Sequence, residues 1–306
     1  MADVQKPAKR GLVDVHAHFL LPGHTDALTR KVMGEWSPRV ALDFMDARGI
    51  DMQLLSFTEI DTADEARRLN DHMASLVREH PGRFGMLASV PLASADEALR
   101  EIGRAGDELG ADGFALPTNV EGRYFGDAFF DPIWSELDRR GAGVFVHPTN
   151  PAGFDLTSCG RPGPLIEFPM DTARTVVDAL YAGVFQRFPG LRMVLAHAGG
   201  VLPALFDRLL ALGTLPWVPH PATLTRDGIR AQLARLYVDT AIAGGPGPLG
   251  AAAAMVGAEH LLFGTDYPAA GIAVIDEQLA LLPEGGFAQR AAAVFPAIAP
   301  RLALPV

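Results

Sequence analysis

Two histidines separated by one residue lie in the first apolar run of the chain. This run, residues 12–19, contains His16 and His18. Alternate side chains of a β-strand share a face and lie roughly 6–7 Å apart, so the two imidazoles can approach one metal ion together. Neutral imidazole is a common ligand of Zn²⁺ and of Mn- or Fe-type ions. The pair alone is a weak signal, and its weight depends on whether other strands end in further ligands.

Three later apolar segments are followed by side chains of the same chemical kind, namely His147, His197 and Asp266. If these segments are strands of one parallel barrel, their C-terminal ends meet at one mouth, where the active sites of such barrels lie. For any single residue a structural role is a fair alternative. That five such residues should share one face by accident is much less probable. The set comprises His16, His18, His147, His197 and Asp266.

Short apolar segments alternate with amphipathic ones along the whole chain. Near-continuous apolar runs are typical of a parallel sheet that is covered on both faces. The expected strands are 12–16, 52–57, 84–90, 113–116, 144–147, 193–197, 236–239 and 261–264. Apolar stripes, N-cap residues and terminal glycines predict helices between them. The expected helices are 37–48, 62–79, 94–109, 130–140, 171–188, 202–212, 225–234, 246–256 and 274–282.

Eight strand–helix units within 306 residues predict an α/β protein, a single-domain (β/α)₈ TIM barrel. We expect a flexible N-terminal tail over residues 1–10 and the barrel over residues 11–306. The alternative is an open, doubly wound sheet, but no Gly-x-Gly-x-x-Gly or Walker-type loop follows a strand.

Composition narrows the possible partners. The formal net charge of −10 argues against a nucleic-acid partner, because such proteins need a basic face. The start of the chain lacks the apolar segment of a signal peptide, and the apolar stretch 249–263 is too short to span a bilayer. The single cysteine, Cys159, excludes an intrachain disulfide and fits a reducing compartment. We therefore expect a cytoplasmic protein without a membrane partner.

In the motifs that contain His16, His18, His147, His197 and Asp266, the chain resembles the amidohydrolase superfamily. Within it, the chain is most similar to the metal-dependent decarboxylases of aminocarboxymuconate semialdehyde and of salicylate-type acids, above all 6-methylsalicylate decarboxylases. The resemblance extends from about residue 11 to about residue 268. It rests on the segments 14–18, 81–84, 109–113, 145–148, 167–172, 187–189, 197–200 and 264–268. It implies a metal-dependent, non-oxidative decarboxylase of a small aromatic or dienoic carboxylic acid.

The resemblance also implies roles for individual residues. Family positions for the acid/base histidine and for a carboxylate-binding arginine fall on His197 and Arg208. Asp171, at a helix start, becomes a substrate-binding candidate, although it can also cap and pair. Arg30, in the long first loop, is a further candidate for the substrate carboxylate, with a surface arginine as the alternative. The implied metal ligands are His16, His18, His147 and Asp266, a set that suits Zn²⁺ and tolerates Mn²⁺.

This chemistry is consistent with the residue types. Loss of CO₂ would leave an unstable carbanion, so protonation must precede or accompany C–C cleavage. A divalent ion can anchor the substrate's carboxylate and a neighbouring hydroxyl, while His197 or Asp266 delivers the proton. The same ligands also suit a hydrolase or hydratase that acts on a lactone, amide or enol acid. A barrel that only binds a ligand has no need for such a set.

Arg208 lies eleven positions after His197 in an expected helix. Three turns carry it roughly 10–15 Å from the mouth of its own barrel. We therefore expect a homodimer with a shared active site, in which Arg208 of one chain binds the substrate carboxylate at the other. The alternative is that Arg208 pairs with Asp207 or another neighbour on a solvated helix.

Overall fold

Eight short strands pair in the order in which they occur in the chain, and each pairing is parallel. The computed structural model describes residues 11–21, 33–283 and 285–302, and the count refers to those residues. The tail expected over residues 1–10 lies outside them. The strands are β1 (Leu12–His18), β2 (Ile50–Ser56), β3 (Phe84–Ser89), β4 (Gly113–Pro117), β5 (Gly143–His147), β6 (Arg192–Leu195), β7 (Tyr237–Asp239) and β8 (Leu261–Leu262).

The barrel closes between β1 and the segment that follows β8. Val15 N–H donates to the carbonyl of Phe263 at 2.9 Å, and Asp266 N–H donates to the carbonyl of His16 at 2.8 Å. His18 N–H donates to the carbonyl of Tyr267 at 2.7 Å. The closure therefore places His16, His18 and Asp266 next to one another at the C-terminal end of the strands.

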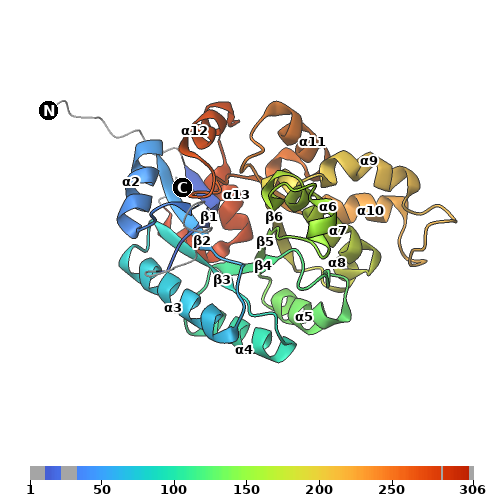
Figure 1. The fold of residues 1–306 in the computed structure, drawn as a ribbon, viewed down its shortest axis with the longest axis horizontal. Coiled ribbons are helices and arrows are strands. Elements are labelled where there is room, and N and C mark those ends of the chain that lie inside the picture. Colours follow the sequence, from blue (N-terminus) through green and yellow to red (C-terminus); the bar gives the residue numbers. More distant parts are fainter. Residues whose placement is uncertain (1–10, 22–32, 284, 303–306) are drawn as a thin grey trace.

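Helices cover the outside of the barrel, as Figure 1 shows. Four of them begin at a Ser or Thr whose hydroxyl accepts a hydrogen bond from an N–H of the first turn, which stabilises the helix start. None of the described helices is both long and apolar enough to cross a membrane. The α-helices are α2 (Pro38–Arg48), α3 (Ala63–Glu79), α4 (Ala95–Asp107), α5 (Asp131–Arg139), α6 (Phe154–Thr157), α7 (Glu167–Tyr181), α8 (Val184–Arg187), α9 (Leu202–Leu212), α10 (Arg226–Leu233), α11 (Pro246–Val256), α12 (Ile272–Leu281) and α13 (Phe287–Val294). The 3₁₀ helices are η1 (Ala128–Phe130), η2 (Gly163–Leu165), η3 (His197–Gly199), η4 (Ala258–His260) and η5 (Pro296–Arg301).

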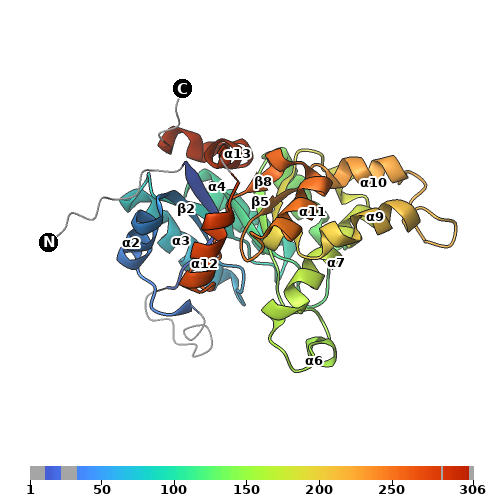
Figure 2. The same cartoon turned by 90° about the horizontal axis from the view of Figure 1, so that it is seen from above.

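The interior of the barrel is closed at one end by α13 and η5. Val294 of α13, Phe295 between the two helices and Ile298 of η5 pack against inward-facing side chains of the strands. Ala288 N–H on α13 donates to the carbonyl of Gly11, just before β1. Figure 2 shows α13 at one end of the strands and α6 at the other. The opposite end, where the strands finish, is left for the functional site.

Two glycines make room for this closure. A Cβ at Gly143 would lie 2.5 Å from the ring of Phe295 and 2.9 Å from the carbonyl oxygen of Val294. A Cβ at Gly113 would lie 2.7 Å from the same ring. Such distances are too short for real contacts, so these strand positions require glycine.

The structure confirms the predicted barrel and its eight strands, with shifts of no more than two residues at any strand end. The expected helix 171–188 is wrong in its bounds. It is two helices, because Gly183 adopts a left-handed conformation with φ of 73° between α7 and α8, and α7 begins earlier, at Glu167. The pattern of the sequence did not predict α13 and η5.

Candidate metal centre and active site

The two histidines of β1 point to the same side of the strand, at the mouth of the barrel. His16 is fully buried and His18 nearly so. Their Nε2 atoms lie 3.2 Å apart. Asp266, which follows β8, places Oδ1 3.3 Å from Nε2 of His16 and 3.1 Å from Nε2 of His18. The closure of the barrel thus joins residues from the first and last strands in one cluster.

His147, at the end of β5, completes this cluster. One ligand atom from each of the four residues lies within 4.8 Å of the others, and all four residues are buried. Nδ1 of His147 is buried without a hydrogen-bond partner among the described residues. A buried polar atom without a partner is costly, and a metal ion would supply one. Three imidazoles and a carboxylate are also a donor set that Zn²⁺ or Mn²⁺ accepts, so the residues fit a divalent ion.

His197 lies beside this cluster, in η3 directly after β6. Its Nε2 is 3.5 Å from Oδ2 of Asp266 and has no hydrogen-bond partner among the described residues. His197 and Ala198 adopt φ values of 56° and 54°, and Gly199 and Gly200 continue the left-handed run. Such backbone conformations are unfavourable for residues with a side chain and gather at functional sites. The turn directs Nε2 of the His197 imidazole toward the carboxylate of Asp266.

Burial and neighbouring charges shift the pKa values of the cluster residues in different directions. Burial and the neighbouring imidazoles hold the pKa of His147 well below its usual range. Burial raises the pKa of Asp266, but the surrounding histidines, His16 above all, bring it well below its usual range. Burial lowers the pKa of His16, but Asp239 and Asp266 outweigh it and raise that pKa to about 10. The position between these carboxylates therefore favours a positive charge, either a proton or a metal ion.

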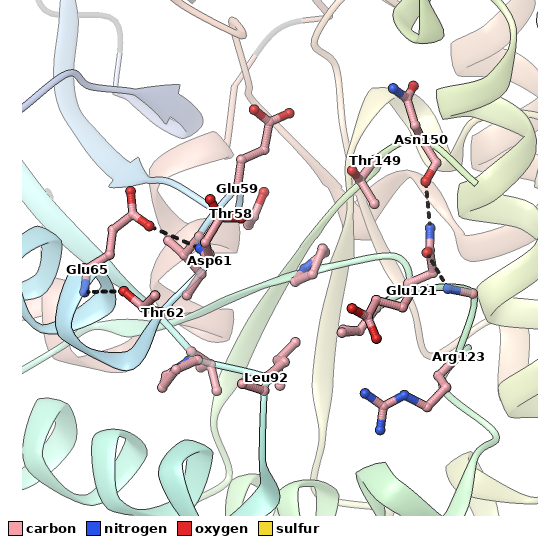
Figure 3. A pocket seen from close by; sticks show the side chains of 18 of the residues that line it. Thr58, Glu59, Asp61, Thr62, Glu65, Leu92, Glu121, Arg123, Thr149 and Asn150 are labelled. Atoms are coloured by element: carbon pink, nitrogen blue, oxygen red, sulfur yellow. Dashed lines mark hydrogen bonds between the residues drawn. The ribbon is translucent and has the colours of Figure 1, made fainter. Parts of the chain in front are cut away.

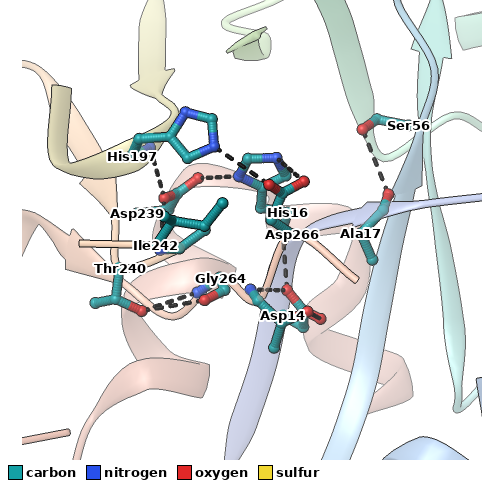
Figure 4. A network of polar contacts seen from close by, with 12 residues as sticks. Asp14, His16, Ala17, Ser56, His197, Asp239, Thr240, Ile242, Gly264 and Asp266 are labelled. Atoms are coloured by element: carbon teal, nitrogen blue, oxygen red, sulfur yellow. Dashed lines mark hydrogen bonds and ion pairs between the residues drawn. The ribbon is translucent and has the colours of Figure 1, made fainter. Parts of the chain in front are cut away.

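Asp239, the last residue of β7, is a site residue that sequence reasoning missed. Its carboxylate is fully buried, and Oδ2 lies 2.7 Å from Nδ1 of His16. Oδ1 accepts hydrogen bonds from the backbone N–H groups of His197 and Ala241, both at 2.9 Å. Figure 4 shows Asp239 between the ring of His16 and the turn that carries His197. The only signal in the sequence was a carboxylate at the end of an apolar strand.

Asp14 forms a second buried carboxylate one layer deeper in the barrel. It accepts hydrogen bonds from the hydroxyl and the N–H of Thr265 at 2.6 and 3.0 Å, and from the amide of Gln53 at 2.9 Å. Burial raises its pKa to about 6, although these hydrogen bonds oppose the change. Because Thr265 directly precedes Asp266, Asp14 fixes the segment that carries Asp266 into the cluster.

The structure places Asp171 and Arg208 outside the cluster. Asp171 is fully buried, and both its oxygens already accept hydrogen bonds, from Tyr124, Asn119, Thr118 and Arg174. Arg208 is exposed on α9, and its guanidinium makes no hydrogen bond or ion pair with another described residue. The pairing with Asp207, the alternative considered for it, is therefore absent. Arg30 lies outside the described residues.

A cavity of about 980 Å³ opens at the same end of the barrel, beside the ends of β2 to β5. Figure 3 shows three carboxylates, of Glu59, Asp61 and Glu65, along one side of it. Glu121 and Arg123 lie on the other side, with Thr149 nearby, two residues beyond His147. Pockets for drug-sized ligands span about 300–1,000 Å³, so the cavity exceeds what one aromatic ring requires.

A (β/α)₈ barrel with three histidines and an aspartate gathered at the C-terminal mouth defines a class of metal-dependent barrel enzymes. The family model described as Amidohydrolase matches residues 13–284, and the chain belongs to this family. Among curated relatives, it is 34% identical over 275 residues to the 6-methylsalicylic acid decarboxylase of Penicillium expansum, covering 84% of each chain. The family predicted from the motifs is thereby confirmed.

Two solved structures share the fold. One is a 2,6-dihydroxybenzoate decarboxylase in complex with 2,6-dihydroxybenzoate, with a TM-score of 0.79 and 24% identity over 94% of this chain and 99% of that chain. The other is a dihydroxybenzoic acid decarboxylase from Polaromonas sp. JS666 with bound manganese and 2-nitroresorcinol, with a TM-score of 0.79 and 22% identity. It covers 96% of this chain and 100% of that chain. At these identities the likeness is one of fold.

Proposed function

We propose that this chain is a metal-dependent, non-oxidative decarboxylase of a small, salicylate-type aromatic carboxylic acid. The observation that carries the proposal is the buried cluster of His16, His18, His147 and Asp266 with His197 beside it. A relative that is 34% identical over most of both chains is named for this reaction on 6-methylsalicylic acid. The dienoic acids expected as a second substrate class have weaker support. A relative from Dictyostelium discoideum that is named 2-amino-3-carboxymuconate-6-semialdehyde decarboxylase is 33% identical but matches only 57% of this chain.

The four clustered residues would hold the divalent ion. When bound, it would fix and polarise the substrate's carboxylate and neighbouring hydroxyl. Zn²⁺ is our first choice for this ligand set, and Mn²⁺ is the second because two structures with this fold contain it. Metal analysis of the purified protein distinguishes the two ions.

His197 is our choice for the residue that delivers the proton to the ring carbon. Oδ1 of Asp266 is already close to the Nε2 atoms of His16 and His18, whereas Nε2 of His197 has no hydrogen-bond partner among the described residues. Oδ2 of Asp266 lies 3.5 Å from this nitrogen and would orient the imidazole toward the substrate. Asp266 would thus serve as a ligand and as the partner of the acid.

The substrate carboxylate would be bound by Arg208 of a second copy in a homodimer. Its guanidinium on α9, which has no bonding partner in the described part of the chain, supports this role. The apolar side chains of Leu156, Leu165 and Trp217 are 89%, 65% and 69% exposed in α6, in η2 and after α9. Exposed apolar surface of this kind marks interaction sites.

Arg30 stays a candidate for the same carboxylate. Asp171 would act on substrate only through the loop residues that it holds, because both its oxygens are engaged. The unpaired, exposed Cys159 supports a reducing, cytoplasmic location.

The reaction is tested by incubating metal-loaded protein with 6-methylsalicylate, salicylate and 2,6-dihydroxybenzoate and measuring released CO₂ and the decarboxylated phenol. We expect stoichiometric CO₂ and phenol from at least one acid, and none after the metal has been removed with a chelator. Lactones and amides are assayed in parallel for hydrolysis. Hydrolysis without CO₂ from any acid would overturn the proposal and favour the hydrolase alternative.

A further inference from the structure

We propose that Asp239 is a positioning residue that couples the metal ligand His16 to the acid/base residue His197. The inference rests on the proposed metal site and adds a residue to it. Asp239 is fully buried and is not one of the four residues of the cluster. Its two oxygens have separate partners, and each partner belongs to a different part of the site.

The first oxygen fixes the ring of His16. Oδ2 lies 2.7 Å from Nδ1, while Nε2 faces His18 and Asp266 at 3.2 and 3.3 Å. A carboxylate can only accept at this distance, so Nδ1 must carry a hydrogen. In the neutral ring Nε2 is then free of hydrogen and has a lone pair for a metal ion. Asp239 thus selects the tautomer that can act as a ligand and also fixes the plane of the ring.

The second oxygen fixes the backbone of His197. Oδ1 accepts the N–H of His197 at 2.9 Å, at the first residue of the left-handed run. A φ of 56° is unfavourable for this residue and persists only when its surroundings hold it. The same oxygen accepts Ala241 N–H at 2.9 Å, which orients the carboxylate from its own loop. The bond to His197 therefore determines where its imidazole lies relative to Asp266.

A comparison of two substitutions separates these functions. In Asp239→Asn the carbonyl oxygen can still accept the two N–H groups, but the NH₂ group then faces Nδ1 of His16. This donor favours the His16 tautomer with hydrogen on Nε2, and that hydrogen opposes metal binding at Nε2. In Asp239→Ala both contacts disappear. Asp112→Asn is the matched control, because Asp112 is also buried and accepts a backbone N–H, from Met86 at 2.8 Å, but does not contact the cluster.

The readouts are the Zn²⁺ dissociation constant, from competition with a chromophoric chelator, and the visible absorption of the Co²⁺-substituted protein. Both Asp239 variants should bind Zn²⁺ about 10–100-fold more weakly, the usual effect of losing such a partner. The Co²⁺ spectrum should change in both, and neither readout should change in Asp112→Asn. Thermal unfolding identifies any variant that fails to fold, in which case the isosteric Asn variant decides the outcome.

Activity at saturating metal tests the coupling to His197. We expect Asp239→Asn to recover kcat to within about tenfold of the unsubstituted chain. We expect Asp239→Ala to stay about 10²-fold lower, because small misplacements of a reacting group cost this much. Unchanged Zn²⁺ affinity in Asp239→Asn, or full kcat in Asp239→Ala, would overturn the proposal. If no acid is decarboxylated by any protein, the proposed function fails, while the affinity and spectrum still test the contact with His16.

Discussion

His16 has a carboxylate on each side of its ring, Asp239 at Nδ1 and Asp266 at Nε2. Burial lowers its pKa, but these carboxylates raise it to about 10, so the metal-free ring is protonated at pH 7.5. A ligand nitrogen must lose its proton when a metal binds. We therefore predict that binding of Zn²⁺ at pH 7.5 releases about one proton per ion. A pH indicator in weakly buffered solution measures it. The value should fall in His16→Gln, and no release from the unsubstituted chain would contradict the prediction.

The second prediction about a single residue concerns His197. His197→Ala should keep the metal, because the four clustered residues would supply its ligands, but should lose about 10²–10⁴-fold in CO₂ release, the range for general acid–base catalysis. His147→Ala is the comparison, since it removes one of the four clustered residues and should lose metal as well as activity. Metal content is measured on both proteins. Equal loss of metal from the two would show that His197 is a ligand instead.

At the scale of elements, the strands could be predicted because each is a short apolar run, and several of these runs end in, or are closely followed by, a histidine or an aspartate. His147 and Asp266 were found in this way, since a barrel brings strand ends together whatever the details of packing. Asp239 also ends a strand, but its partner His16 is 223 positions away, and no local pattern reports such a contact. The closure of the barrel by α13 was missed for the same reason, because it depends on the space that Gly113 and Gly143 leave for Phe295.

That closure gives a prediction about stability. In Gly143→Ala the new methyl group would lie 2.5 Å from the ring of Phe295, and overpacking of this kind costs about 1–3 kcal/mol. Gly250→Ala is the control, because nothing lies within 4 Å of a Cβ there. In helix α11 this change should stabilise the chain by about 0.5–1 kcal/mol. Urea unfolding measures both free energies. Equal stability of the two variants would show that α13 does not pack tightly against β5.

At the scale of the whole molecule, the question is whether one chain forms a complete site. Arg208 is exposed on α9 and has no bonding partner among the described residues, so it is available to a second copy. We predict that Arg208→Ala and His197→Ala, each inactive alone, complement one another when they are mixed and refolded. Random pairing makes half the dimers mixed, each with one intact site, so about a quarter of the activity should return.

The control for this experiment is a mixture in which both partners carry His197→Ala, together with mass spectrometry of differently labelled subunits to verify exchange. If exchange is verified and the mixture of the two variants stays inactive, Arg208 does not act across an interface. In that case Arg30 becomes the first candidate for the substrate carboxylate.

The seam between β1 and the segment after β8 has a consequence for the order in which the protein is made. His16 and Asp266 are 250 positions apart (266 minus 16) and meet only across this seam. At about 5–20 residues per second, a ribosome needs roughly 12–50 s to pass from one to the other. During this time the nascent chain presents histidines without the carboxylate that completes their set. The complete set of ligands can therefore form only after Asp266 has been synthesised. Metal binding at full affinity would then report that the last strand has joined the barrel.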